Sequence, residues 1–158
     1  MKKITLSLGS NIGDRKNNLK LCIKLLNRRL RISKTSNIYE TEPWGNLKHK
    51  PYLNLVIEVV SGLNSYSILK FTKEIEREMG RYRKNNLAPR VIDIDIITIG
   101  NQLILKNDLQ VPHKRFTKRM FVLKPMSEIN LRMKIPRSNF RVYQALNYSK
   151  DLKTVKIF

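Results

Sequence analysis

The chain has 158 residues, 41% of them hydrophobic, which is enough for one domain with a core and a cleft. Its single cysteine, Cys22, excludes an internal disulfide and a cysteine-based zinc cluster. The formal net charge of +20 favours an anionic partner, such as nucleic acid, an anionic membrane or an anionic small molecule, although lysine enrichment along the whole chain produces such a charge without any function. No apolar run is long enough for a signal peptide or a membrane span, so we expect a cytoplasmic protein.

The first half of the chain alternates strand and helix signals. Residues 4–8 predict a strand, and Asp14, after a glycine-containing turn, is a candidate N-cap for a helix. Apolar residues continue that helix at helical spacing: Leu19, Cys22, Ile23, Leu26 and Leu30. Residues 31–39 and 52–60 predict two further strands, separated by a loop over residues 40–50.

The second half begins with a helix that starts near Ser65 and stops at Gly80. A basic loop then leads into an aliphatic strand around residues 92–97, which Gly100-Asn101 turns into a hairpin with residues 102–105. Three short elements follow: a helix near residues 125–129, a helical turn at 143–146 and a strand at 154–157. This order indicates one sheet with helices packed on it, an α+β domain over residues 1–158.

Two acidic side chains interrupt the aliphatic strand. Because alternate side chains of a strand share a face, Asp93 and Asp95 point one way and Ile92, Ile94 and Ile96 the other. The two aspartate Cα atoms then lie about 7 Å apart. Carboxylates at this spacing can bind one or two hard cations such as Mg²⁺.

Arginines lie just upstream of the acidic pair, at positions 81, 83 and 90. Arg81, Arg83 and Arg90 are always charged and can bind phosphate oxygens through two parallel hydrogen bonds. Together with the acidic pair they predict a phosphate site. The alternative is a strand with a solvated acidic face, which is the commoner meaning of an isolated Asp-Ile-Asp.

An ordered series of segments resembles the 6-hydroxymethyl-7,8-dihydropterin pyrophosphokinase family of folate biosynthesis. The resemblance runs from Ile4 to about Ile129. Its segments are Leu8-Gly9-Ser10-Asn11-Ile12-Gly13-Asp14, Tyr39-Glu40-Thr41-Glu42-Pro43-Trp44-Gly45, Pro51-Tyr52-Leu53-Asn54, Ile75-Glu76 with Arg81-Tyr82-Arg83, Pro89-Arg90-Val91-Ile92-Asp93-Ile94-Asp95-Ile96, Val111-Pro112-His113 and Arg119-Met120-Phe121.

This resemblance implies a ferredoxin-like α+β fold with a mainly antiparallel sheet. It also implies a transferase that moves the terminal diphosphate of ATP, as one group, to the hydroxymethyl oxygen of the pterin and releases AMP. Such a reaction needs positioning and charge neutralisation more than a protein nucleophile. Mg²⁺, with two ions expected, is the implied cofactor, and ATP is the co-substrate.

The resemblance also assigns roles to individual residues. The implied catalytic residues are Arg81, Arg90, Asp93 and Asp95, and the implied metal ligands are Asp93 and Asp95. The implied ATP-binding residues are Glu76, Arg83, Arg90, Ile96, His113 and Arg119. The implied pterin-binding residues are Thr41, Glu42, Trp44, Tyr52, Asn54 and Phe121, with Tyr52 and Phe121 stacking on the flat ring and Asn54 facing its donor and acceptor edge.

The chain departs from the family pattern at two places. Leu87-Ala88 replaces a common Trp-Gly pair before Pro89-Arg90, and Glu42 stands where a proline is common. Neither change removes a metal ligand or a phosphate-binding arginine, so we expect retained activity with weaker closure of the loop or a raised KM.

Three other functions remain open from the residues alone. A basic α+β domain also suits an RNA-binding module, but Asp93 and Asp95 on a central strand would repel phosphate unless a metal intervenes. Another Mg²⁺-dependent phosphoryl or nucleotidyl transferase would use the same pair, and an inactive paralogue is disfavoured because Asp93, Asp95, Arg90 and His113 are all present. We therefore expect small-molecule substrates, no nucleic-acid or membrane partner, and a monomer.

Overall fold

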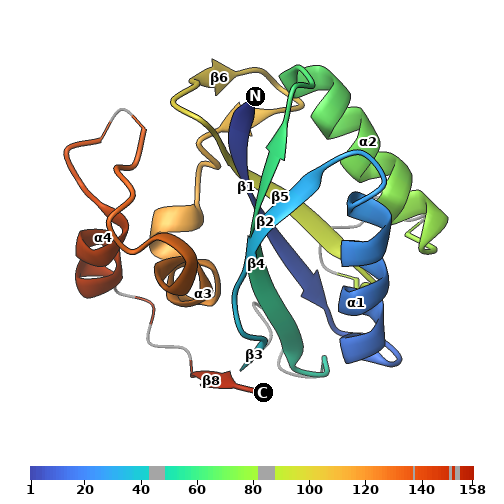
Figure 1. The fold of residues 1–158 in the computed structure, drawn as a ribbon. Coiled ribbons are helices and arrows are strands. Elements are labelled where there is room, and N and C mark those ends of the chain that lie inside the picture. The colour runs from blue at the N-terminus through green and yellow to red at the C-terminus, as the bar shows by residue number, and fades with distance from the viewer. Residues whose placement is uncertain (43–48, 82–87, 137, 150, 152–153) are drawn as a thin grey trace.

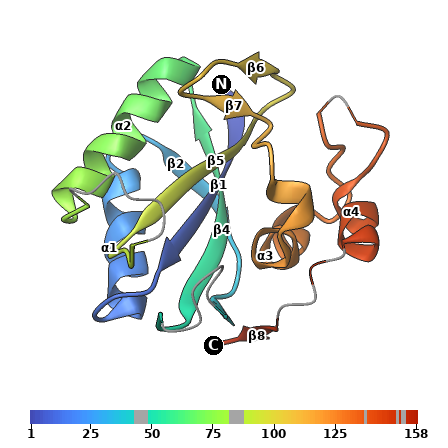
Figure 2. The same cartoon turned by 180° about the vertical axis from the view of Figure 1, so that it is seen from behind.

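The computed structural model describes residues 1–42, 49–81, 88–136, 138–149, 151 and 154–158. A central sheet lies between two helical layers, with α1 and α2 on one face and α3 and α4 on the other (Figures 1 and 2). In chain order the elements are β1 (Lys2–Ser10), α1 (Arg15–Leu26), β2 (Arg31–Thr35), β3 (Tyr39–Thr41), β4 (Tyr52–Ser61), α2 (Ser65–Glu78), β5 (Asp93–Ile99), β6 (Ile104–Leu105), β7 (Gln110–Val111), a 3₁₀ turn (Phe116–Lys118), α3 (Met120–Asn130), α4 (Val142–Tyr148) and β8 (Val155–Ile157).

The main sheet has six strands in the order β5-β1-β4-β3-β8, with β2 also paired to β4. All of these pairings are antiparallel, and β1 pairs with β4 on one side and β5 on the other. The two β-α-β connections, through α1 and α2, place both helices on the same face of the sheet. The predicted ferredoxin-like α+β arrangement is therefore confirmed.

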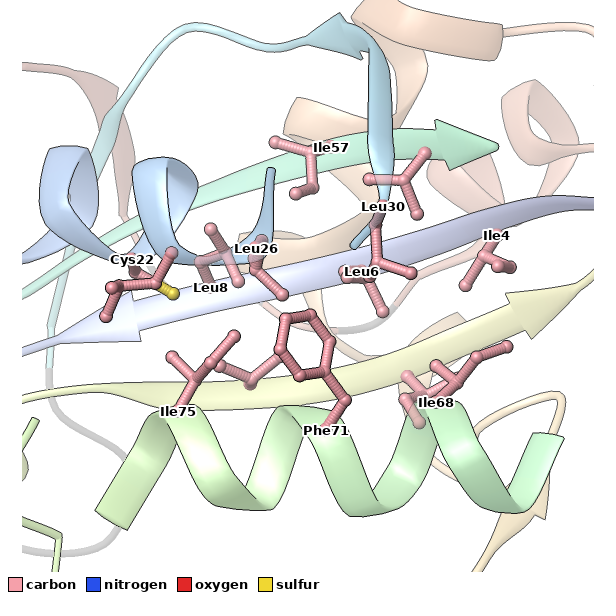
Figure 3. Close-up of a cluster of buried hydrophobic side chains, with 14 of the residues drawn as sticks. Ile4, Leu6, Leu8, Cys22, Leu26, Leu30, Ile57, Ile68, Phe71 and Ile75 are labelled. Atoms are coloured by element: carbon pink, nitrogen blue, oxygen red, sulfur yellow. The ribbon is translucent and has the colours of Figure 1, made fainter. Parts of the chain in front are cut away.

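One face of the sheet forms the larger core with α1 and α2 (Figure 3). Alternate residues of β1, Ile4, Leu6 and Leu8, point into this core and are fully buried. Cys22 lies among them, as the helical spacing predicts, and burial raises the pKa of its thiol. Other members from the helices and β4 are Leu26, Ile57, Ile68, Phe71 and Ile75.

The opposite face is covered only in part, by α3 and α4. Val56 of β4 and Ile97 of β5 are buried against α3, through Val122 and Met126. The start of β5 lies beside α3 and is not covered by it (Figure 2). The candidate site lies there.

Two helix starts and one helix stop are as predicted. Asp14 caps α1, because its side chain accepts a hydrogen bond from the Asn17 backbone N–H at 3.0 Å. α2 starts at Ser65, after the cap residue Asn64, and Gly80 adopts a positive φ of 94° beyond its end.

The prediction of one strand over residues 31–39 is wrong, because β2 and β3 are separate strands on β4. Ser36 separates them: its hydroxyl accepts a hydrogen bond from the Val56 N–H at 2.9 Å and donates one to the Asn37 carbonyl at 2.8 Å. The side chain thus takes a place that a continuing strand would give to the backbone. The predicted loop 40–50 is also too long, because Glu40 and Thr41 belong to β3.

The predicted hairpin after β5 is wrong as well. Gly100 does form a tight turn with φ of 51°, but β6 pairs with β7 in a separate two-stranded sheet and not with β5. The helix predicted near residues 125–129 is longer, since α3 starts at Met120 and contains Pro125 within it. Among the described residues, no helix is both long and apolar enough to cross a membrane.

Candidate active site

The acidic pair lies on the face of β5 that α1 and α2 do not cover. Asp93 and Asp95 are partly exposed, whereas Ile92, Ile94 and Ile96 are buried in the core behind them. In the β1–β5 ladder Asp93 pairs with Gly9 and Asp95 with Ser7. The two carboxylates therefore share a face, as the alternation in the sequence predicts.

Asp93 is held between two arginines. Arg81, just past α2, donates to Oδ1 of Asp93, and Arg90 donates to Oδ2. Burial alone would raise the pKa of Asp93, but the charges of Arg90 and Arg81 outweigh burial and lower it. Asp93 is accordingly an ionised carboxylate with both oxygens engaged by guanidinium groups.

Arg81 is anchored from below by Glu76, a buried residue of α2. One oxygen of Glu76 accepts from Arg81 and from the Ile94 backbone N–H at 2.8 Å, and the other accepts from Lys73 at 2.8 Å. Burial raises the pKa of this carboxyl against the opposing effects of Lys73, the Ile94 N–H and Arg81. Glu76 thus ties the end of α2 to β5 beneath the acidic pair.

Asp95 faces an arginine at a longer distance than Asp93 does. Its Oδ2 lies 3.6 Å from Nη1 of Arg119, and burial together with the neighbouring Asp93 charge raises its pKa to about 6. The Arg119 guanidinium also lies over the ring of Phe121, 5.5 Å from its centroid. Arg119 is therefore shared between the acidic pair and an aromatic wall.

Arg90 is fixed by the turn that precedes α1. The Asn11 side-chain oxygen accepts from the Arg90 N–H at 2.6 Å, and the Asn11 N–H donates to the Arg90 carbonyl at 3.0 Å. This turn matches neither the Walker nor the dinucleotide pattern, and here it positions an arginine backbone.

His113 enters the site from the segment after β7. Its backbone N–H donates to the Ile97 carbonyl at 2.9 Å, and its Nδ1 accepts from the Arg115 N–H at 3.3 Å. Burial and the nearby Arg119 charge lower the pKa of the imidazole. With Nδ1 accepting, the neutral ring carries its proton on Nε2, which is then a hydrogen-bond donor.

The opposite side of the site is aromatic and amide-lined. Tyr52 is half-buried at the start of β4, and Asn54, two residues on, is buried on the same face. Nδ2 of Asn54 donates to Oγ1 of Thr41 at 2.7 Å. Gly9 lies directly under this amide, because a Cβ there would come 2.9 Å from Asn54 Oδ1.

These side chains surround one cavity of about 480 Å³. Its described lining comprises Ser7, Gly9, Thr41, Glu42, Tyr52, Asn54, Lys73, Arg81, Arg90, Asp93, Asp95, His113, Arg115, Arg119 and Phe121. A second cavity of about 240 Å³ shares Lys73, Asp95 and His113 with the first and extends along Ile94, Ile96 and the β6–β7 connection. The shared residues make the two cavities neighbours.

The structure brings most of the predicted site residues together. Eleven of them line the first cavity: Thr41, Glu42, Tyr52, Asn54, Arg81, Arg90, Asp93, Asp95, His113, Arg119 and Phe121. Ile96 lines the second cavity, and Glu76 lies buried beneath the first and holds Arg81. The predicted residues Trp44 and Arg83, and the departure at Leu87, lie outside the described residues.

The sequence predictions missed Lys73, Ser7, Gly9 and Arg115. The sequence contains a pattern that could have identified Lys73, because Lys73 lies one helical turn before Glu76 and so shares its helix face. No local pattern could have identified Ser7 and Gly9, since their place in the cavity depends on the pairing of β1 with β4 and β5.

The donor set suits a magnesium ion that brings its own phosphate ligands. Among the described residues no group of three or more His, Cys, Asp and Glu gathers to form a metal cage. Mg²⁺ is commonly bound by one or two carboxylates, with waters and substrate phosphates completing its coordination. Asp93 and Asp95 on one cavity wall, with arginines around them, fit that pattern.

Comparisons with known proteins agree on one family. The family described as 7,8-dihydro-6-hydroxymethylpterin-pyrophosphokinase (HPPK) matches residues 5–131. A bifunctional protein FolKE from Lactococcus lactis subsp. cremoris is 44% identical over 131 residues, covering 82% of this chain and 38% of that protein. A 2-amino-4-hydroxy-6-hydroxymethyldihydropteridine pyrophosphokinase from Bacillus subtilis is 40% identical over 126 residues, covering 78% of this chain and 75% of that protein.

Solved structures show the same fold. The crystal structure of wild-type Plasmodium falciparum HPPK-DHPS with pteroate matches with a TM-score of 0.73 at 18% identity, covering 92% of this chain and 42% of that chain. The chain thus spans about two fifths of the bifunctional proteins that it matches.

Proposed function

This chain belongs to the 7,8-dihydro-6-hydroxymethylpterin-pyrophosphokinase family, and we propose that it transfers diphosphate from MgATP to the hydroxymethyl group of 6-hydroxymethyl-7,8-dihydropterin in folate biosynthesis. One observation carries the proposal: a single cavity has an acidic pair ringed by arginines on one side and an aromatic and amide-lined wall on the other. The acidic pair with its arginines suits a metal-bound triphosphate, and the aromatic and amide-lined wall suits a flat heterocycle.

In the proposed reaction one phosphorus–oxygen bond forms and another breaks. The pterin hydroxyl oxygen forms a bond to the β-phosphorus of ATP. The bond from the β-phosphorus to the oxygen that bridges the α- and β-phosphates breaks, and AMP leaves with the electron pair. The hydroxyl proton is released. No covalent intermediate with the protein is required, so the chain acts by positioning the two substrates and stabilising charge.

Asp93 and Asp95 are the proposed magnesium ligands, and two ions are proposed. Bound Mg²⁺ would neutralise the triphosphate and polarise the phosphorus that is attacked. Arg81 and Arg90 compensate the charge of Asp93. Because they already point into the cavity, we propose that they bind phosphate oxygens when nucleotide is present.

His113 and Arg119 are proposed to bind the same triphosphate beside the acidic pair. The proton on Nε2 of His113 provides a neutral donor, and Arg119 adds a fixed positive charge 3.6 Å from Asp95. Arg83 is proposed as a further ATP-binding residue from the sequence resemblance alone. As negative charge builds on the departing AMP oxygen, these donors stabilise it.

The nucleoside of ATP is proposed to occupy the second cavity. Ile96 lines that cavity, and Lys73, Asp95 and His113 connect it to the phosphate site. Glu76 is proposed to act on the nucleotide side through Arg81 and Lys73, which its carboxylate holds.

The pterin is proposed to lie between Tyr52 and Phe121. Stacking on an aromatic ring adds about 0.5–1.5 kcal/mol beyond the burial of area. Asn54, oriented by Thr41, offers Oδ1 to the ring's donors, and Glu42 lines the same side. Trp44 is proposed to complete the pocket from the sequence resemblance.

We further propose that the enzyme works as a monomer in the cytoplasm, as a single domain over residues 1–158. The single cysteine is buried and free, which suits a reducing compartment.

An assay of AMP release from MgATP and the hydroxymethyl pterin tests the proposed function. We expect pterin-dependent AMP formation by the wild type, and a loss of about 10²–10³-fold or more in Asp95→Ala, because charge stabilisation at the transferred group disappears. Glu74→Ala is the matched control, since Glu74 is an exposed carboxylate on α2 outside the cavity lining. Circular dichroism checks that each variant is folded.

Three outcomes count against the proposal. Release of ADP in place of AMP would indicate a different phosphoryl transfer, and an active Asp95→Ala would remove the proposed role of the acidic pair. Saturable RNA binding with a steep salt dependence, without ATP binding, would favour the RNA-binding alternative.

A further inference from the structure

Arg15, the first residue of α1, links β3 to the residue before β4, behind the proposed pterin side of the cavity. Its Nη1 donates to Oε1 of Glu40 at 2.8 Å and to the carbonyl of Pro51 at 2.7 Å. Glu40 pairs with Leu53, whose side chain lies in the core beneath α1. Arg15 therefore approaches the sheet from the face opposite the cavity.

The position of this contact along the strands is specific. Thr41 and Tyr52, which both line the cavity, form the last pair of the β3–β4 ladder. Arg15 binds the residue before each of them, Glu40 and Pro51. It thus adds a charged cross-link at the end of the ladder, directly behind the two cavity residues.

Phe158 in turn contacts the side chain of Arg15. β8 pairs with the outer edge of β3, and the Phe158 N–H donates to the Ile38 carbonyl at 2.9 Å. The Arg15 guanidinium lies over the Phe158 ring, 5.8 Å from its centroid, and the Lys16 ammonium lies 5.5 Å from the same centroid. The Arg15 side chain is only 22% exposed as a result.

The link to the cavity runs through Thr41. Its hydroxyl accepts the hydrogen bond from Nδ2 of Asn54 at 2.7 Å, and this bond fixes which way the Asn54 amide faces. A shift of β3 away from β4 would lengthen that bond and leave the amide free to rotate.

We infer that Arg15 is a positioning residue for the pterin side of the cavity, held in place by Phe158. The substrate named here rests on the proposed function, but the cross-link is independent of it. Arg15 keeps Thr41 and Tyr52 at the spacing in which Asn54 presents its oxygen to the ligand. Phe158 lies beyond residues 5–131 that the family matches, so this chain supports its cavity with a segment outside the family core.

Calorimetric titration with an ATP analogue that cannot react, and with the hydroxymethyl pterin, tests the inference. In Arg15→Met we expect the Kd of the pterin to rise about tenfold, since small displacements of positioned groups have effects of this order. The Kd of the ATP analogue should stay within about twofold of the wild-type value, because the residues proposed to bind the phosphates of ATP do not contact Arg15. Phe158→Ala should show a smaller rise, and Phe158→Tyr should restore wild-type binding.

Lys16→Met is the matched control, because Lys16 lies over the same ring but its described contacts include neither Glu40 nor Pro51. A lower Tm in Arg15→Met with an unchanged pterin Kd, or an equal weakening of the binding of both ligands, would overturn the inference.

Backbone hydrogen exchange at residues 39–41 gives a readout without ligand and should accelerate in Arg15→Met but not in Lys16→Met. If the wild type does not bind the pterin, the proposed function fails, and unchanged exchange would separately refute the role of Arg15.

Discussion

At the scale of single residues, Glu76 shows how a buried charge organises the site. Its carboxylate is 3% exposed and accepts hydrogen bonds from Arg81, Lys73 and the Ile94 N–H. Buried carboxylates are tolerated when they are paired and fully hydrogen-bonded. One side chain therefore links α2, β5 and Arg81 of the cavity wall.

Glu76→Gln should lower the free energy of unfolding by about 1.5–3 kcal/mol, the range for hydrogen bonds to charged groups. The amide keeps the shape but loses the charge between Lys73 and Arg81. Urea denaturation measures the change. Glu78→Gln, which breaks only the exposed pair with Arg28, should cost no more than about 1 kcal/mol, and equal losses in both variants would contradict the central place of Glu76.

Gly9→Ala should weaken pterin binding about tenfold, because a Cβ at this position would press on Asn54 Oδ1 from 2.9 Å and move the amide. Gly62→Ala is the control, because a Cβ there meets nothing within 4 Å. Calorimetry on both variants makes the comparison. Unaltered binding in Gly9→Ala would show that the Asn54 amide does not contact the ligand.

Residue-level predictions from the sequence succeed where one local rule is sufficient. The period of two along β5 places Asp93 and Asp95 on one face, and helical spacing places Cys22 in the core. Gly9 lies in the cavity because it pairs with Asp93 on one side and Asn54 on the other. A glycine in a strand gives no sign of such neighbours before the register is known.

At the scale of elements, the errors in the strands involve long-range pairing. The break between β2 and β3 depends on Ser36 meeting Val56, and β6 pairs with β7 although Gly100 makes a suitable hairpin turn. The helix predicted near residues 125–129 begins earlier, at Met120, because the packing of α3 against β4 offsets the missing N–H of Pro125. The strong periodic elements, β1, α1, β4, α2 and β5, were all predictable.

The junction of α3 with β3 should make stability depend on pH. Glu128 of α3 accepts from the Asn37 N–H at 2.8 Å and from the Tyr39 hydroxyl, and these bonds outweigh burial and lower its pKa below 4.5. A lowered folded-state pKa gives stabilisation that is present above the unfolded value and is lost as pH falls through the folded value.

Glu128→Gln should therefore be less stable than the wild type at pH 7, by about 1 kcal/mol or less because the side chain is exposed. The difference should shrink below about pH 4.5, where the unfolded carboxyl takes up its proton. Urea midpoints between pH 3.5 and 7 measure it. A difference that stays constant over this range would show that the carboxylate charge is not involved.

At the scale of the whole molecule, the charge of +20 has two consequences. Positive charge repels itself across the folded surface, and it attracts anionic substrates to a cavity that already contains several arginines. Salt screens both effects, so it should stabilise the fold and weaken the binding of anionic substrates.

Raising NaCl from about 0.05 to 0.5 M shortens the Debye length from about 14 to 4 Å, so the Tm should rise while the KM for ATP also rises. Differential scanning calorimetry and initial rates measure the two. In Lys20→Glu with Lys24→Glu, two exposed positions on α1, the gain in Tm should be smaller. A Tm that is independent of salt would show that repulsion does not limit stability.

The two arginines bound to Asp93 also bear on conformational entropy. Freezing a long side chain such as arginine costs up to about 2 kcal/mol, and in this molecule Asp93 holds the side chains of Arg81 and Arg90 through hydrogen bonds. Holding these two guanidinium groups is a task separate from the metal binding that is proposed for Asp93. Chelating Mg²⁺ would leave both guanidinium groups in place, whereas Asp93→Asn would let them move, so the two treatments should differ in how tightly metal-free nucleotide binds.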